Sequence, residues 1–128
     1  MKFLLLASLG GALGAGARHL VNEGFAARGL AGYPWATLAV NVAGSLAMGL
    51  VMALVLSRQG LSPELRVFVA TGILGGFTTF SSFSLDVWRL VTEPGGGGAL
   101  ALGYVAASVL LSIGALFLGL ALGRGSLA

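Results

Sequence analysis

Residues 71–84, which read TGILGGFTTFSSFS, decide the fold because they are apolar enough for a membrane and yet carry an interruption. The pair Gly75-Gly76, followed by a cluster of Thr and Ser, predicts a break in the helix. Backbone carbonyls released at membrane depth need a partner. A cation suits them, since hard cations take oxygen ligands and broken membrane helices hold Na⁺ through unwound carbonyls. The alternative is a break repaired by the hydroxyls of Thr78 and Thr79 alone.

The composition indicates a membrane protein. The chain has 128 residues, of which 57% are hydrophobic and 9% are charged. Soluble domains carry about 25% charged residues, so a soluble fold of this size would lack charges to cover its surface. A disulfide-stabilised secreted scaffold is excluded because the chain has no Cys.

Four segments are long and apolar enough to cross about 30 Å of hydrocarbon. The sequence therefore predicts an all-α membrane protein with four transmembrane helices, the third broken mid-membrane. It forms a single four-helix domain over residues 1–128, in the cell (inner) membrane, with both termini on one side. The predicted spans are residues 3–21, 34–57, 63–91 and 99–123.

The basic residues are spread over the loops, although the net charge is +3. They form no patch with interleaved aromatic residues, which argues against a nucleic-acid partner. A weak bias of Lys and Arg permits insertion in both orientations, so we expect an antiparallel, dual-topology homodimer. A single orientation set by the modest excess is the alternative. One side carries four basic residues and the other two: Lys2, Arg58, Arg66 and Arg124 against Arg28 and Arg89.

Polar residues inside the spans are costly and are therefore candidate functional groups. Arg18, near the end of the first span, either snorkels to the interface or attracts anions to an aqueous vestibule. Asn41, well inside the second span, is either a hydrogen-bonding link between helices or a donor that faces a permeating anion.

Two further patterns concern side chains that recur along one helix face. Phe77, Phe80 and Phe83 share a face if the helix resumes after the break, and their electropositive ring edges suit an anion. The fourth span carries one polar stripe at a spacing of four residues, which indicates a wet track. Its members are Tyr104, Ser108 and Ser112.

Catalytic chemistry finds little support in the sequence. The chain has one His and four acids, and we find no nucleophile–base pair, metal-ligand spacing or phosphate-binding loop. We therefore expect no enzyme activity. Two other classes are a small multidrug-type cation transporter, which needs a membrane-embedded carboxylate, and a non-conducting assembly subunit.

Three pieces together make the chain resemble the Fluc (CrcB) fluoride channels over essentially its whole length. They are GGALGAGAR at residues 10–18, TLAVNVAGS at 37–45 and GGFTTFSSFS at 75–84. The resemblance implies an antiparallel dimer with two pores that passively exports fluoride. The chain departs from the family pattern at four positions where Tyr, Gly, Thr and Glu are common: His19, Ala36, Ser82 and Asp86.

The resemblance also implies roles for individual residues. The carbonyls of Gly75 and Thr78, from both subunits, would hold a central structural Na⁺. Arg18 would lie near the cytoplasmic vestibule. The remaining residues would contact or line the fluoride path: Asn41, Phe80, Phe83, Ser81, Ser82, Tyr104, Ser108 and Ser112.

Overall fold

The computed structural model describes residues 1–57 and 60–126, and these form helices and connecting turns. Four helical runs in this part of the chain are long and apolar enough to cross a membrane, as expected. The third run, Pro63–Thr92, consists of several consecutive elements. The helices are α1 (Lys2–Ala26), α2 (Trp35–Leu56), α3 (Pro63–Arg66), the π-helix η1 (Val67–Leu74), α4 (Gly75–Phe77), α5 (Phe80–Thr92) and α6 (Gly98–Ser126).

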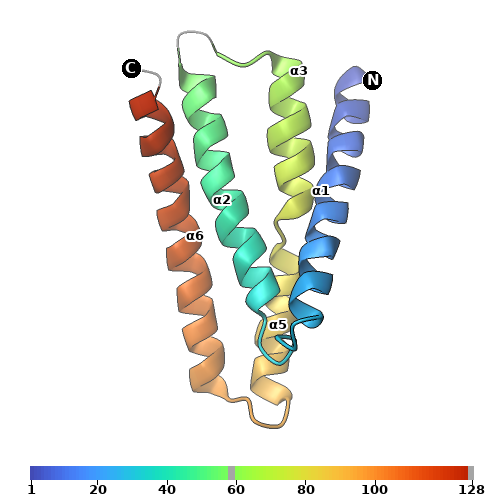
Figure 1. The fold of residues 1–128 in the computed structure, drawn as a ribbon, viewed down its shortest axis with the longest axis vertical. Helices are drawn as coiled ribbons and strands as arrows, with labels where there is room; N and C mark the ends of the chain where they lie inside the picture. Colours follow the sequence, from blue (N-terminus) through green and yellow to red (C-terminus); the bar gives the residue numbers. More distant parts are fainter. Residues whose placement is uncertain (58–59, 127–128) are drawn as a thin grey trace.

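The helices lie close to the predicted spans, and both termini lie at the same end of the molecule (Figure 1). The largest difference is at α1, which continues past residue 21 to Ala26. Its last turns contain Asn22 and Glu23, because a helix does not have to stop where the apolar residues stop. Arg58 lies outside the described residues, so the basic charge seen at the end with the termini comes from Lys2, Arg66 and Arg124.

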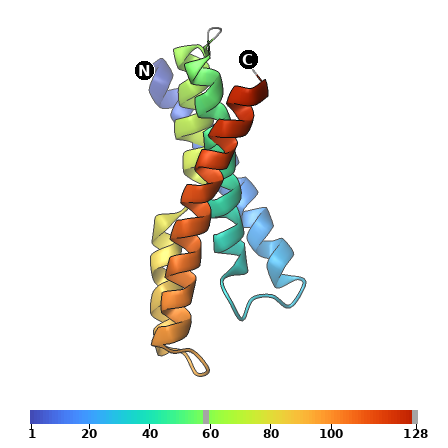
Figure 2. The same ribbon diagram turned by 90° about the vertical axis from the view of Figure 1, so that its left-hand side faces the viewer.

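The spans pack closely where glycine faces a neighbouring backbone. A Cβ on Gly14 would overlap the carbonyl oxygen of Ile73, and one on Gly10 would lie 2.9 Å from Cα of Gly72. Glycine thus allows α1 to approach η1 at backbone distance. A Cβ on Gly119 of α6 would likewise overlap the Leu46 carbonyl of α2. Beyond the broken helix, α5 runs beside α6 and away from α1 (Figure 2).

The third span is interrupted, but not at the glycine pair. Gly75 keeps helical angles of φ −64° and ψ −35°, whereas Thr78 has ψ 159° and Thr79 has φ −153° and ψ 124°. The expectation of a break at Gly75-Gly76 is therefore wrong by about one helical turn. Gly76 instead allows close packing against α1, because a Cβ there would lie 3.0 Å from Cα of Gly11.

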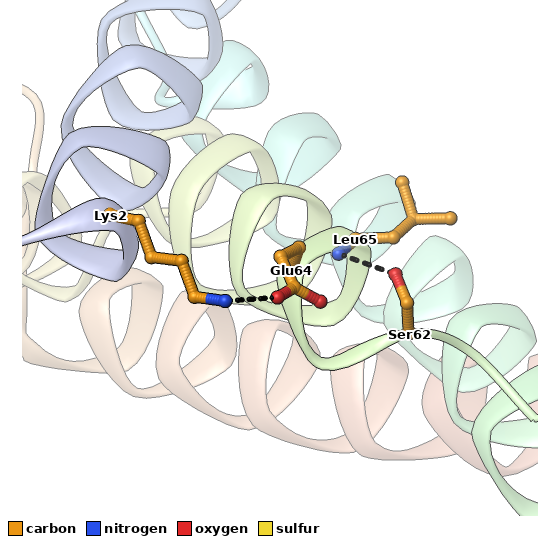
Figure 3. A network of polar contacts seen from close by, with 4 residues as sticks. All are labelled: Lys2, Ser62, Glu64 and Leu65. Atoms are coloured by element: carbon orange, nitrogen blue, oxygen red, sulfur yellow. Dashed lines mark hydrogen bonds and ion pairs between the residues drawn. The ribbon is translucent and has the colours of Figure 1, made fainter.

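An ion pair joins the start of α1 to the start of the third span (Figure 3). Lys2 Nζ lies 2.6 Å from Glu64 Oε1. Ser62 Oγ caps α3 by accepting a hydrogen bond of 3.2 Å from the Leu65 N–H. Both charged side chains are exposed, so the pair adds little stability. It nevertheless balances the charge of Lys2 at the end that holds the termini.

Candidate functional site

Asn41 of α2 holds the two sides of the break. Its Nδ2 donates to the carbonyl of Thr79 at 3.0 Å, and its Oδ1 accepts from the Thr79 N–H at 2.8 Å. The side chain therefore replaces backbone hydrogen bonds that the break removes inside a membrane span. Of the two roles expected for Asn41, the link between helices is thus observed. The second proton on Nδ2 stays available, because an amide nitrogen carries two.

Hydroxyl groups repair another part of the break. Thr78 Oγ1 donates to the carbonyl of Leu74 at 2.9 Å. Thr79 Oγ1 accepts from the Ser82 N–H at 3.2 Å and so caps the start of α5. The order of residues fits this geometry, since Thr is a good N-cap and its extended backbone suits a β-branched side chain.

The carbonyls of Gly75 and Thr78 are among those that lose their helical donors at the break. In an unbroken α-helix the Gly75 carbonyl would accept from the Thr79 N–H, and the Thr78 carbonyl from the Ser82 N–H. Those N–H groups donate instead to Asn41 Oδ1 and Thr79 Oγ1. Gly75 is also exposed on the surface of the single chain. The carbonyls expected to bind a cation are thus among those that the break leaves without a helical donor.

A groove of about 370 Å³ lies beside the break, between α2, α5 and α6. It brings together five of the side chains that the sequence singles out, from three different spans: Asn41, Phe80, Phe83, Ser108 and Ser112. The groove is largely apolar but carries several hydroxyl groups. No charged side chain is among the described residues that line it. Such a lining suits a small ion that is held by donors and ring edges rather than by an opposite charge.

The rings in the groove belong to a longer series. The centroids of Phe80 and Phe83 lie 5.4 Å apart, and Phe83 lies 5.4 Å from Tyr104. Tyr33 meets Tyr104 edge-on at 5.8 Å. Phe80 is 78% exposed, so one face of the site is open in the single chain. Phe77 lies before the break, so it does not continue the α5 stripe of Phe80 and Phe83.

Other expected site residues lie outside the groove. The hydroxyls of Ser81 and Ser82 lie 3.4 and 3.2 Å from Thr79 Oγ1. Tyr104 is completely buried, and its hydroxyl donates to Asp86 Oδ2 at 3.3 Å. Arg18 is half-buried on α1, and no ion pair to it is found in the described part of the chain.

Two features of the site escaped the sequence analysis. Asp86 lines a second, polar pocket of about 210 Å³ together with Tyr33, Arg89 and Glu93. Only its position as an acid within the third span hinted at this role. Ser45 lines the main groove. Its signal was its position four residues after Asn41, which places both side chains on the same face of α2.

The fold and the groove define a multi-pass membrane protein with a polar break in its third span. Residues 5–120 match the family described as CrcB-like protein, Camphor Resistance (CrcB), and the chain belongs to this family.

Curated relatives agree with this assignment over nearly the whole chain. A protein of Rhodospirillum centenum is 54% identical over 128 residues and covers 100% of both chains. A protein of Mesorhizobium japonicum is 54% identical over 121 residues, with 94% of this chain and 95% of the relative covered. One from Chelativorans sp. is 55% identical over 128 residues, covering 99% and 100%. All three are named fluoride-specific ion channel FluC. Ion channels catalyse no covalent reaction, so the chain is not an enzyme.

Proposed function

We propose that this protein is a fluoride-selective passive channel that exports fluoride across the cell membrane. The observation that carries the proposal is the groove, where an amide, two phenylalanine rings and serine hydroxyls from three spans converge beside the break. The names of the relatives, which match nearly the whole chain, support fluoride as the ion. Flux runs down the fluoride gradient and needs no chemical energy.

The lining explains how a strongly hydrated anion could lose its water in such a path. Each serine hydroxyl and the free proton of Asn41 Nδ2 can donate one hydrogen bond to the ion. The ring edges of Phe80 and Phe83 carry partial positive charge, which attracts an anion. The rings have no oxygen or nitrogen acceptor. Arg18 raises the anion concentration in the approach to the pore. Ser81 and Ser82 do not line the groove of the single chain. Their hydroxyls lie near Oγ1 of Thr79, a residue that does line it, so their role in this path is indirect.

The working unit of the proposal is an antiparallel homodimer with two pores. A groove with an opening on one face, and with Phe80 78% exposed, cannot enclose an ion path within one chain. A second copy supplies the missing wall. Each copy has a groove of its own, so the dimer has two pores. This geometry supports a dimer.

The dimer in this proposal also contains a structural Na⁺. The carbonyls of Gly75 and Thr78 suit it, because their helical donors are diverted to Asn41 and Thr79. A ligand that binds only the folded dimer stabilises it by about 2.7 kcal/mol at a concentration 100 times its Kd. We expect the melting temperature of the purified protein to fall when Na⁺ is replaced by N-methylglucamine. A melting temperature that does not depend on Na⁺ would remove the ion from the proposal.

The deciding experiment is ion efflux from liposomes that contain the purified protein. Liposomes loaded with potassium fluoride or potassium chloride are diluted into salt-free buffer with valinomycin, and each anion is followed with its own electrode. We expect rapid fluoride release and negligible chloride release. Equal release of both anions would refute selectivity, and tight liposomes would favour a non-conducting subunit. A cation transporter is disfavoured because no carboxylate is among the described groove residues.

A further inference from the structure

Ser45 occupies a place in the groove that no expected role accounts for. It lies on α2 four residues after Asn41, so the two side chains share one face of the helix. Both line the groove, with Ser112 of α6 also in the lining. Its neighbour Gly44 is buried against the side chains of Phe77 and Thr78. Ser45 thus lies one helical turn along α2 from Asn41, the residue that bonds the break.

Most Ser and Thr hydroxyls in membrane helices donate a hydrogen bond to a backbone carbonyl three or four residues earlier, and this chain offers clear examples. Ser57 donates to the Leu54 carbonyl at 2.8 Å, and Ser84 donates to the Phe80 carbonyl at 2.9 Å. Thr92 does the same with the Trp88 carbonyl at 2.9 Å. These three hydroxyls all lie outside the groove lining.

The serines of the groove behave differently. Ser108 Oγ is buried and has no partner at hydrogen-bond geometry among the described residues, although the Tyr104 hydroxyl is nearby. Ser45 and Ser112 donate to no backbone carbonyl in the described part of the chain, whereas Ser57 and Ser84 do. A donor kept without a partner inside a membrane span is costly, so it points to a ligand.

We infer that Ser45 is a further ion-binding residue of the pathway, which donates a hydrogen bond to the anion from the α2 wall of the groove. This inference rests on the proposed function. Asn41 has only one amide proton left after it binds Thr79, so an ion that passes it meets few donors on α2. Ser45 supplies the next one. Ser112 lines the same groove from α6, so the two serines offer donors from two helices.

The test is the fluoride efflux rate of two variants in the same liposomes. Ser45→Ala removes the donor and keeps the size of the groove nearly unchanged. We expect a rate about fivefold lower than that of the unmodified protein, which corresponds to about 1 kcal/mol. Ser45→Thr keeps a hydroxyl and should restore at least half of the rate. Ser57→Ala is the control, because it removes a hydroxyl at the C-cap of α2 that is already bonded to the backbone.

The outcomes separate this inference from the proposed function. Normal flux in Ser45→Ala would overturn the inference and leave the channel intact. Absent flux in the unmodified protein would overturn the channel itself. If Ser45→Ala lowers the melting temperature but its flux per unit of folded protein equals that of the unmodified protein, the serine is structural and the inference fails.

Discussion

Asn41 combines two tasks that a single side chain rarely performs together. One oxygen and one proton of its amide bond the backbone of Thr79, and the same residue lines a groove with aromatic and hydroxyl groups. The amide is well suited to this position, because it is neutral and both donates and accepts. A carboxylate of the same shape could accept from the Thr79 N–H but would repel the Thr79 carbonyl.

We expect Asn41→Asp to reduce fluoride efflux at neutral pH by at least tenfold. A tenfold change corresponds to about 1.4 kcal/mol. Two unit charges at 4 Å interact by about 4 kcal/mol at an effective dielectric constant of 20, so repulsion of the ion is sufficient. The measurement is the initial rate of efflux per unit of folded protein recovered by gel filtration.

The matched control makes the same chemical change elsewhere. Asn22→Asp lies on an exposed position near the end of α1 and should leave the efflux rate unchanged. If Asn41→Asp conducts as well as Asn22→Asp does, then Asn41 belongs to the helix contact alone and does not face the ion.

At the scale of helices, the chain is assembled as two closely packed pairs. α1 packs on η1 and α4, and α2 packs along α6, with glycine at the contact in each pair. Lipid tails are as apolar as the helix surfaces, so close packing rather than hydrophobicity drives such association. The broken span belongs to both pairs, because its first half contacts α1 and its second half contacts α6.

The contact between α2 and α6 predicts a large effect from one methyl group. Gly119→Ala would drive its Cβ into the Leu46 carbonyl, so the helices must move apart. We expect a loss of about 1–3 kcal/mol, as for other overpacked sites, and a lower melting temperature in detergent. Gly114→Ala is the control, because nothing lies within 4 Å of a Cβ at that position of α6. A control that is destabilised as strongly would show that the contact with Leu46 is not the cause.

The spans themselves were predictable, since length and hydropathy set where a helix can cross a membrane. The exact place of the break was not. Gly75 and Gly76 have the composition of a flexible joint, but glycine serves equally where two backbones touch, and only the position of Gly11 on α1 distinguishes the two uses. The π-helix from Val67 to Leu74 likewise has no signal in the pattern of apolar residues.

The candidate site was predictable to a similar degree. The residues that face the groove follow from helix periodicity, which placed Ser108 and Ser112 on one face of α6 and paired Phe80 with Phe83. The bonds of Asn41 to Thr79 did not follow, because they join positions 38 residues apart. Tyr104 shares the periodicity of the serines, but it is fully buried against Phe83 and Tyr33, and no one-dimensional pattern reports that packing.

At the scale of the whole molecule, the two ends of the protein differ little in basic charge. Lys2, Arg66 and Arg124 lie at the end with the termini, where Lys2 is paired with Glu64. Arg28 and Arg89 belong to the opposite end, where the Arg89 and Glu93 side chains approach to 4.0 Å. An orientation signal this small should be reversible in either direction by removing two or three charges.

A reporter fused to the C-terminus measures the orientation directly. We expect the unmodified chain to give signal from both sides of the membrane. The double variant Arg28→Gln/Arg89→Gln should place the C-terminus in the cytoplasm. The triple variant Arg58→Gln/Arg66→Gln/Arg124→Gln leaves one basic residue at the end with the termini against two at the other, and should place the C-terminus outside, because the more basic end stays inside. Neither variant alone can form an antiparallel dimer, so each alone should lose fluoride efflux. Coexpression of the two should restore efflux, since they supply the two orientations separately. Full efflux from one variant of uniform orientation would refute the antiparallel dimer, whatever ion the pore carries.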